Sequence, residues 1–437
     1  MSEYDVIVVG AGMAGLNATA TAQASGARVA LIERTDRVGG TCPIRGCIPS
    51  KAMIRSAEIA QDARRSDEFG VRTGDVSVDF AKVMARVRGI AEKGSSGARG
   101  WVDSLAGVDL VFGRGELADP TTVLVDGREL TAPTVLLTTG AEPGRVPIPG
   151  LDQTPHWTSD DVLLDITELP DEVLIIGAVP IGLEFGQAFT RFGSRVTIVE
   201  KLPRLLPDSD PELADELAGH LTDEGITLLT GADVQRAETG DDGRPTLVVE
   251  RGGVEETLTG GALLLSVGRG PAVSGLGLEA AGVEHSASGV VVDERLQTSL
   301  PGVWAAGDIL TGEWGAFTHV ARRLGREMVE NALGTDPHDV DNDVGPRAIF
   351  TDPEIASVGL TAGEAEEQGF EVVVGRSGFS GGKARAWGQE KGAAVIVGEK
   401  GTGRILGAEI LGYHAADLLH PVVVAMQAPG APASLIA

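Results

Sequence analysis

Cys42 and Cys47 are the residues of this 437-residue sequence best suited to redox chemistry. Two cysteines are too few for the disulfide framework of a small secreted protein, whereas a close pair is typical of redox or metal sites. In a regular helix, residues five apart have Cα atoms roughly 8–9 Å apart, and a disulfide needs less than about 7 Å. A bond between the two therefore requires irregular backbone, which Pro43, Gly46 and Pro49 supply.

Two other interpretations of the cysteine pair are a pair of buried structural thiols and a zinc site. Zinc is disfavoured because no second pair of Cys or His has a matching spacing. The pair also lies at the start of a predicted helix, and a helix N-terminus stabilises a thiolate. The sequence therefore predicts a redox-active pair and no metal.

A predicted strand–loop–helix–strand unit directly precedes the cysteines. Residues 6–9 form an apolar run typical of a strand buried on both faces, and residues 29–32 form a second strand that ends in Glu33. The loop after the first strand carries glycines with the spacing GxGxxG: Gly10, Gly12 and Gly15. The first permits a tight turn, the second lets a pyrophosphate approach the backbone, and the third lets helix and strand pack closely. With Glu33 placed to bind a ribose, the unit predicts a dinucleotide site at a helix N-terminus.

The same unit occurs a second time. Residues 173–176 are the first strand, residues 177–182 the loop, and residues 196–199 the second strand, which ends in Glu200. Glu33 and Glu200 follow the first glycine of their loops by the same spacing. Two such folds predict two dinucleotides; two structural units without a ligand are the alternative.

The second loop departs from the pattern at its middle position. Val179 replaces the glycine and is followed by Pro180. A Cβ atom there crowds the place where a pyrophosphate would lie. We therefore expect an altered affinity or pose of the second nucleotide, but the same fold.

Composition and charge exclude several classes of partner. The net charge of −27 disfavours nucleic acid and anionic membranes. No apolar run reaches the about 18 residues that a membrane span needs, and the acidic start, with Glu3 and Asp5, is unlike a secretory signal. We therefore expect a cytoplasmic protein of two to four globular domains.

At this point the sequence resembles a known family. The stretch GGTCPIRGCIPSK, residues 39–51, is similar to the redox-active segment of the FAD-dependent pyridine nucleotide–disulfide oxidoreductases, closest to the dihydrolipoamide dehydrogenase-like and mercuric reductase-like members. Further segments resemble family motifs in the family's order: residues 138–143, 266–271, 303–310, 317–327 and 350–361.

The resemblance implies an α/β fold with two Rossmann-like dinucleotide-binding domains, for FAD and for NAD, and a C-terminal α+β interface domain that is incomplete. The implied FAD domain comprises residues 1–150 and 271–345, with the NAD domain at 151–270 and the interface domain at 346–437. It also implies a homodimer with sites shared across the interface.

The resemblance also assigns residues to the two cofactors. Those expected to contact FAD are Gly10, Gly12, Gly15, Glu33, Thr41, Lys51, Gly115, Thr139, Gly140, Asp308 and Thr318, the last through its backbone. Those expected to contact NAD are Gly177, Gly182, Glu200, Val234, Gly268 and Arg269.

The implied catalytic residues are Cys42, Cys47, Lys51 and Glu184. Cys47 would be the flavin-proximal sulfur and Cys42 the interchange sulfur. Lys51 would lie beside flavin N5, with Glu184 as its ion-pair partner next to the nicotinamide. A solvated helix face is the alternative for Lys51 and Glu184.

The implied activity is a two-electron relay between NAD(H), FAD and the cysteine pair, as in dihydrolipoamide dehydrogenase. The partner is expected to be a small-molecule thiol or disulfide, with a lipoyl domain as a further candidate. Alternatives are a disulfide of the glutathione or mycothiol type, mercuric ion, or an FAD-bound form inactive on disulfides. Glu200 predicts a preference for NADH over NADPH, because a carboxylate accepts from a 2′-OH and repels a 2′-phosphate.

Family members usually end in a His–Glu segment that supplies an acid/base to the partner's cysteines. Here the similarity continues to residue 427, and residues 428–437 do not match that segment. We interpret His414 and His420 as structural residues. On this basis we expect slow exchange with external dithiols and a weakened dimer, whether the chain is a natural short form or a truncated one.

Overall fold

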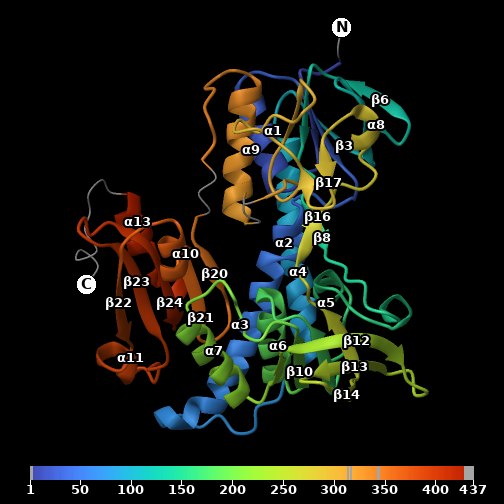
Figure 1. The fold of residues 1–437 in the computed structure, drawn as a ribbon. Coiled ribbons are helices and arrows are strands. Elements are labelled where there is room, and N and C mark those ends of the chain that lie inside the picture. The colour runs from blue at the N-terminus through green and yellow to red at the C-terminus, as the bar shows by residue number, and fades with distance from the viewer. Residues whose placement is uncertain (1–2, 313, 315–316, 342–344, 428–437) are drawn as a thin grey trace. The chain divides into compact units, whose positions relative to one another are not determined.

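The computed structural model describes residues 3–312, 314, 317–341 and 345–427. The first two residues of the chain and residues 428–437, on which the expectation about the C-terminal segment rests, lie outside the described residues. The chain divides into two compact units (Figure 1). The first unit comprises Met1–Ala52, Ala85–Arg145 and Arg269–Val344, and the second comprises Met53–Met84, Val146–Gly268 and Gly345–Ala437.

The first unit is built around a parallel sheet in the order β19-β7-β1-β2-β3. The central strand β1 (Val6–Val9) pairs with β2 (Val29–Glu33) and β7 (Thr134–Leu137), while β3 (Val108–Phe112) and β19 (Val303–Ala305) lie outside them. Every residue of β1 and β2 is buried, which explains why both strands are continuous apolar runs. The predicted strands and the α/β class are confirmed.

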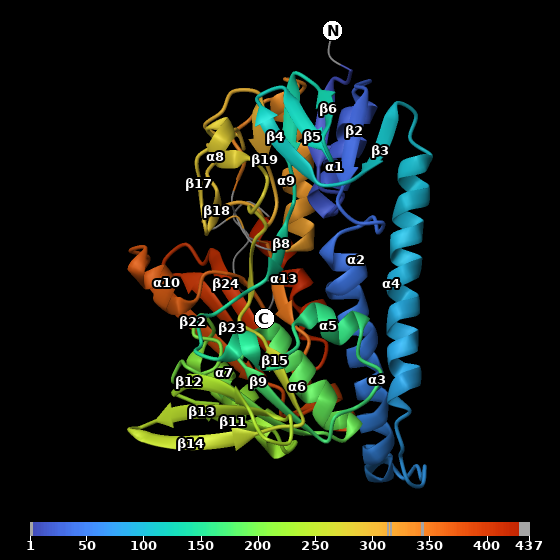
Figure 2. The ribbon, with the colours of Figure 1, turned by 90° about the vertical axis from the view of Figure 1, so that its right-hand side faces the viewer.

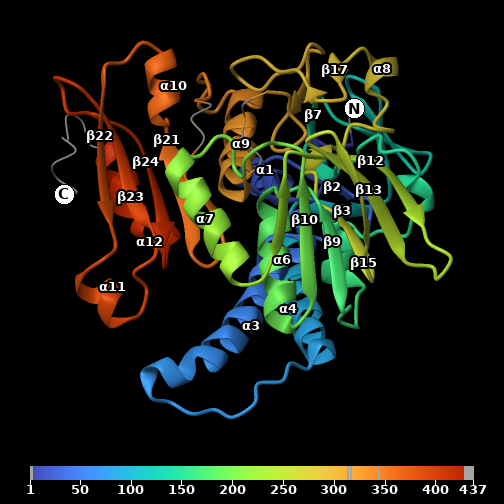
Figure 3. The same ribbon diagram turned by 60° about the horizontal axis from the view of Figure 1, so that its bottom comes forward.

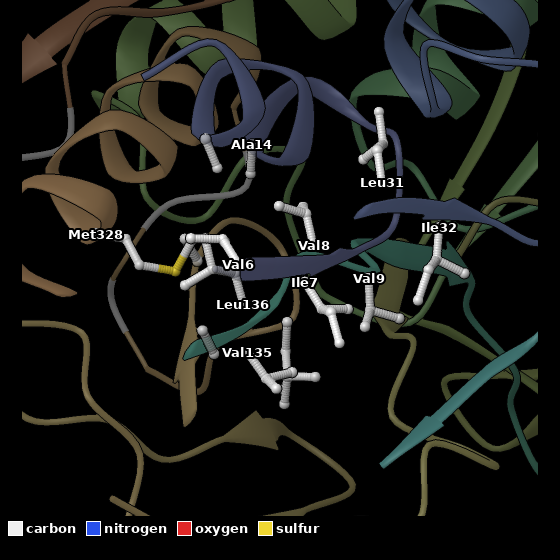
Figure 4. Packing of buried hydrophobic residues seen from close by; sticks show 14 of the residues in the cluster. Val6, Ile7, Val8, Val9, Ala14, Leu31, Ile32, Val135, Leu136 and Met328 are labelled. Atoms are coloured by element: carbon white, nitrogen blue, oxygen red, sulfur yellow. The ribbon is translucent and has the colours of Figure 1, made fainter. Parts of the chain in front are cut away.

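Two helices, α1 (Met13–Ala24) and α9 (Thr318–Ala332), lie side by side next to this sheet (Figures 1 and 4). Small residues allow their close approach, because a Cβ atom on Gly325 would lie 2.2 Å from the carbonyl oxygen of Ala14. Figure 4 shows Met328 from α9 near the buried side chains of β1 and β7. Each fully buried aliphatic side chain of this core stabilises the fold by about 1.5–3 kcal/mol.

The rest of the first unit consists of short elements around the sheet. β4, β5 and β6 form an antiparallel sheet (Figure 2), and the pairs β8–β16 and β17–β18 are also antiparallel. Their bounds are β4 Gly115–Asp119, β5 Thr122–Val125, β6 Arg128–Thr131, β8 Ala141–Pro143, β16 Arg269–Pro271, β17 His285–Ser286 and β18 Gly289–Val290. Two further helices of this unit are α2 Thr41–Arg45 and α8 Leu278–Ala281, while α3 Cys47–Arg65 and α4 Phe80–Asp103 each have residues in both units.

The second unit contains a second parallel sheet, in the order β11-β10-β9-β15. These strands are β11 Thr227–Thr230, β10 Arg195–Glu200, β9 Glu172–Ile176 and β15 Ala262–Leu265. Helix α6 (Pro180–Phe192) runs alongside β9 and β10 (Figure 3) and buries Leu183, Phe185 and Phe189. Pro180 at its first turn is favourable, since the N–H that proline lacks would have no partner within the helix. The second predicted βαβ unit is therefore confirmed.

Two antiparallel sheets complete the second unit. One has the order β12-β13-β14, and the other, in the C-terminal part, has the order β20-β21-β24-β23-β22. Their bounds are β12 Ala232–Thr239, β13 Pro245–Arg251, β14 Val254–Thr259, β20 Arg347–Ile349, β21 Glu354–Gly359, β22 Val372–Gly378, β23 Ala393–Glu399 and β24 Ile405–Gly412. The helices are α5 Ser159–Leu164, α7 Pro211–Asp223, α10 Ala362–Glu367, α11 Gly382–Ala386, α12 Ala415–Leu418 and α13 His420–Gln427, with short 3-10 turns at Ser66–Phe69 and Leu151–Gln153.

His414 and His420 lie at the starts of the last two helices. His414 has a positive φ of 57° and contacts Asp417 at 3.3 Å, and the Nδ1 atom of His420 is 2.9 Å from the carbonyl oxygen of Ala416. Over the described ranges of the chain, the helices are all too short or too polar to cross a membrane.

Candidate active site

The loop after β1 has three glycines. At two of them, neighbouring backbone atoms leave no room for a side chain. Gly10 has a φ of 108°, and a Cβ atom there would lie 2.6 Å from the carbonyl oxygen of Thr138. A Cβ atom on Gly15 would lie 1.9 Å from the carbonyl oxygen of Gly10. Glycine at both positions is therefore required by the chain itself.

Gly12 differs from its two neighbours in the loop. It caps α1 with φ −83° and ψ −169°, an extended conformation open to any residue, and the nearest atom to an added Cβ is the Cα of Gly40, at 3.9 Å. The space beside Gly12 is thus open, next to the free N–H groups that begin α1. A pyrophosphate fits such a cradle, which supports the assignment of FAD to this loop.

Glu33, at the end of β2, is 8% exposed and faces this loop. One carboxylate oxygen accepts from the Ala11 amide at 3.1 Å, and the other accepts from the amide and hydroxyl of Thr35 at 3.0 and 3.1 Å. A carboxylate offers about four acceptor sites, so one remains for a ribose hydroxyl.

The other predicted FAD residues gather where the parallel strands of the first unit end. Thr139 and Gly140 follow β7, and the Thr139 hydroxyl donates to the carbonyl oxygen of Ala272 at 2.9 Å. Gly115 begins β4, where a Cβ atom would lie 3.0 Å from the side chain of Val9. Asp308 follows β19, and burial raises the pKa of its carboxyl against the opposing charge of Arg269. Ligands of parallel α/β sheets bind at this carboxyl edge.

The cysteine pair lies at a break between two helices. Cys42 is the second residue of α2, Cys47 is the first residue of α3, and Gly46 separates them with φ −143° and ψ −117°. A Cβ atom on Gly46 would lie 3.0 Å from the carbonyl oxygen of Thr41. The irregular backbone predicted between the cysteines is confirmed. Both thiols are free, so the structure describes the dithiol form of the pair.

The pKa values of the two thiols are shifted in opposite directions. The pKa of Cys47 is lowered to about 6, first by a hydrogen bond from Cys42 and then, against the effect of burial, by the hydroxyl of Thr318 and the ammonium of Lys51. The pKa of Cys42 is raised, first by its hydrogen bond to Cys47 and then by burial. Cys47 is therefore the thiolate of the pair near neutral pH, and Cys42 is the thiol.

Lys51 and Glu184 belong to different units. Lys51 follows Cys47 by one turn of α3, a spacing that places two side chains on the same helix face. Glu184 lies in α6 of the second unit, is 5% exposed, and accepts from the amide of Phe350 at 3.0 Å. The ion pair between Lys51 and Glu184 stays a prediction.

The loop after β9 repeats the geometry of the first loop. Gly177 has a φ of 96°, and a Cβ atom there would lie 1.9 Å from the carbonyl oxygen of Ser266; one on Gly182 would lie 2.3 Å from the carbonyl oxygen of Gly177. Val179 caps α6 with φ −69° and ψ 165°. Glu200 accepts from the amide of Ala178 at 2.8 Å.

The remaining residues predicted to bind NAD do not all lie in one unit. Val234, in β12, and Gly268, with a φ of 87°, belong to the second unit. Arg269 belongs to the first unit, where its guanidinium donates to the carbonyl oxygen of Ala141 at 2.9 Å and to the Thr41 hydroxyl at 3.5 Å. Arg269 thus lies among the residues predicted to bind FAD, and its role toward NAD stays a prediction.

Sequence reasoning missed a polar row on α6. Gln187 exchanges two hydrogen bonds of 2.8 Å with the backbone of Asp352. Arg191, 4% exposed, donates to the carboxylates of Glu224 at 2.6 Å and Asp352 at 2.8 Å. With Glu184, these residues hold the segment after β20 against α6. The signal was present in the spacing of three polar residues on one face of an otherwise apolar helix.

The chain is similar to known proteins over most of its length. Residues 4–325 match the family described as pyridine nucleotide-disulphide oxidoreductase, and residues 345–437 match its dimerisation domain. Dihydrolipoyl dehydrogenase of Bacillus subtilis is 35% identical over 434 residues, which are 96% of this chain and 90% of that protein. Mercuric reductase of Bacillus cereus is 34% identical over 428 residues, which are 97% of this chain and 67% of that protein.

A solved structure is also similar. The HOCl-induced flavoprotein disulfide reductase RclA from Escherichia coli has a TM-score of 0.88 and 29% sequence identity, with 99% of this chain and 95% of that chain covered.

Proposed function

The chain belongs to the pyridine nucleotide-disulphide oxidoreductase family, and we propose that it exchanges electrons between NADH and a small dithiol or disulfide of the lipoamide type. It is an FAD-dependent disulfide oxidoreductase that uses NAD(H). The observation that carries the proposal is the cysteine pair at the break between α2 and α3, where the surroundings favour a thiolate at Cys47 and a thiol at Cys42. Two sulfurs with different proton affinities can take different roles in one exchange.

FAD, when bound, supplies the two-electron chemistry that connects a nicotinamide with the cysteine pair. Gly10, Gly12 and Gly15 would hold its pyrophosphate at the start of α1, with Glu33 at the ribose and Asp308 beyond it. Lys51 would keep a positive charge beside Cys47, and Glu184 would orient that lysine.

The exchange itself uses both sulfurs. Cys42 attacks one sulfur of a substrate disulfide as its proton passes to the hydrogen-bonded Cys47 thiolate; the departing substrate thiolate then takes this proton from Cys47, and a mixed disulfide remains. Cys47 thiolate then attacks the Cys42 sulfur, which breaks the mixed disulfide and releases the second substrate thiolate, protonated by water. The pair ends as a disulfide, oxidised by two electrons, and the substrate ends as two thiols.

Three finer inferences accompany this proposal. The match to a dimerisation domain supports a homodimer, and a lipoyl domain is a candidate carrier of the substrate. A close cysteine pair that works by cycling between thiol and disulfide supports a cytoplasmic setting. Soft metal ions form a second candidate substrate class, favoured by the thiolate at Cys47 and by the similarity to mercuric reductase.

The test is NADH oxidation by the FAD-loaded protein with lipoamide, glutathione disulfide and mercuric ion as separate acceptors. We expect lipoamide to be reduced fastest, and Cys42→Ser and Cys47→Ser to lose reduction of disulfides while both keep reduction of a quinone dye. The dye is the matched control, because it requires FAD and NADH but neither cysteine. Undiminished lipoamide turnover in Cys42→Ser would contradict the proposal, and faster reduction of mercuric ion would favour the second candidate.

A further inference from the structure

The side chain of Thr318 contacts the reactive sulfur of the site. Its Oγ1 atom lies 3.3 Å from the Sγ atom of Cys47, although the two residues are 271 positions apart in the sequence. Thr318 is the first residue of α9 and Cys47 is the first residue of α3, so the contact joins the starts of two helices. Both belong to the first unit.

The direction of this hydrogen bond follows from the charge on the sulfur. A thiolate has no proton to give and accepts strongly, so the Thr318 hydroxyl donates. A sulfur within a disulfide is a weak acceptor by comparison. The same hydroxyl therefore interacts more favourably with the pair after reduction than before it.

We propose that Thr318 is a catalytic residue. Its hydroxyl donates to the Cys47 thiolate and so favours the dithiol form of the pair over the disulfide. The inference rests on the proposed role of Cys47. The step it favours is the uptake of two electrons and one proton by the disulfide, which breaks the sulfur–sulfur bond and leaves Cys42 as a thiol and Cys47 as a thiolate. The electrons come from NADH through the activity already described.

The groups that act on Cys47 can be separated by experiment. Cys42 from α2 and Lys51 from α3 are the titratable groups that lower the pKa of Cys47, and Thr318 from α9 acts with them. The Thr318 hydroxyl also lowers the pKa of Cys42, against the larger effects that raise it. Thr318 does not titrate, so its removal changes no charge at the site.

The first experiment measures the pKa of Cys47 in the FAD-loaded protein, from the pH dependence of its alkylation by iodoacetamide. A Cys42→Ser background leaves a single thiol and keeps a hydrogen-bond donor at position 42. Thr318→Val removes the hydroxyl while keeping the branched shape, and we expect it to raise the pKa of Cys47 by about 1, a tenfold change in the ionisation constant. Thr318→Ser restores a hydroxyl and should leave the pKa close to that of the background.

Thr21→Val is the matched control. The Thr21 hydroxyl donates within α1, to the carbonyl oxygen of Asn17 at 2.9 Å, in the same unit but away from the cysteines. Its removal should leave the pKa of Cys47 unchanged.

The second experiment measures the redox equilibrium of the Cys42–Cys47 pair against a glutathione buffer in the otherwise unchanged protein. If the pKa of Cys47 rises from about 6 to about 7, the equilibrium constant for reduction at pH 7 falls by about fivefold. The sign follows from linkage, because a lowered thiol pKa stabilises the reduced form only above that pKa. The difference between Thr318→Val and the unchanged protein should therefore vanish at pH 5.

The inference is overturned if Thr318→Val leaves the pKa of Cys47 unchanged, or if Thr318→Ser behaves like Thr318→Val. Neither measurement depends on turnover with any acceptor. Failure of the proposed function, shown by disulfide reduction that survives Cys42→Ser, is therefore distinguishable from failure of the role of Thr318.

Discussion

The two glycine loops, one after β1 and one after β9, have nearly the same backbone but differ in their middle residue. Gly10 and Gly177 begin them with φ values of 108° and 96°. Gly12 and Val179 follow with ψ values of −169° and 165°, which are both extended. The chain thus makes the same turn with glycine and with valine at this position.

The comparison separates what the fold requires from what a ligand requires. The first and third glycines of each loop are enclosed by backbone atoms, so a side chain there collides with the chain itself. The middle position has open space in the first loop, and glycine is needed there only if a ligand approaches. We infer that the first loop binds its pyrophosphate closely and that the second binds less closely.

The largest expected effect is a loss of stability when the third glycine of either loop is replaced by alanine. Gly15→Ala and Gly182→Ala place a Cβ atom 1.9 and 2.3 Å from a carbonyl oxygen of the same loop. Each should lower the free energy of unfolding by about 3 kcal/mol, measured by urea denaturation. A loss of stability in only one of the two variants would contradict the structural equivalence of the loops.

The next effect is specific to the first loop. Gly12→Val should weaken FAD binding by about 100-fold, because its side chain fills the cradle beside the helix start. The secondary structure seen by circular dichroism should remain, since valine adopts this conformation at position 179. Fluorescence titration of the apoprotein with FAD measures the affinity, and an unchanged Kd would place the pyrophosphate elsewhere.

The reverse change in the second loop should strengthen binding. Val179→Gly removes the Cβ atom at the pyrophosphate position and should tighten NADH binding by about tenfold. Isothermal titration of the oxidised, FAD-loaded protein with NAD⁺ or an unreactive NADH analogue measures the change. A weaker affinity in the variant would mean that the loop has adapted its ligand pose to valine.

The loops also differ in a buried hydroxyl behind the third glycine. Thr138 donates to the carbonyl oxygen of Gly10 at 2.9 Å, whereas the hydroxyl of Ser266, 2% exposed, finds no hydrogen-bond partner within the described ranges of the chain. Thr138→Val should therefore cost about 1 kcal/mol of unfolding free energy, and Ser266→Ala should be close to neutral. Thermal denaturation of both variants and of the unchanged protein measures the difference. A larger loss of stability in Ser266→Ala than in Thr138→Val would contradict the prediction.

The smallest expected effect concerns the choice of nucleotide. Glu200→Gln keeps an acceptor for the amide of Ala178 but removes the charge that repels a 2′-phosphate. We expect the preference for NADH over NADPH to fall by roughly fivefold in stopped-flow reduction of the bound flavin. Lys201 and Arg204 are nearby cations that weakly favour a 2′-phosphate, and Lys201 contacts Asp233 at 3.1 Å. A preference of the unchanged protein for NADPH would contradict the prediction.

Much of this arrangement follows from local sequence. Buried parallel strands are continuous apolar runs, and the loops have glycine spacings with a steric cause, so residues 6–15 and 173–182 predict their own structure. The helix break between Cys42 and Cys47 was predictable for the same reason, because proline and glycine act on the backbone next to them.

Contacts between distant segments were not predictable in this way. The hydroxyl of Thr318 reaches Cys47 across 271 positions, and Gln187 reaches Asp352 across 165. Spacing along the chain carries information about one helix or strand but not about which two elements meet. Arg269 illustrates the same limit, because its motif ends the nucleotide-binding segment while its side chain lies with the residues predicted to bind FAD.

The polar row on α6 has a consequence for how the second unit comes apart. Arg191 is buried between Glu224, at the end of α7, and Asp352, in the segment that leads into β21. Separating that segment from α6 would leave a buried guanidinium with half of its charge partners, at a cost of about 3–5 kcal/mol. The C-terminal sheet should therefore melt together with the nucleotide-binding sheet in one calorimetric transition, and a protease should not release it as an intact fragment.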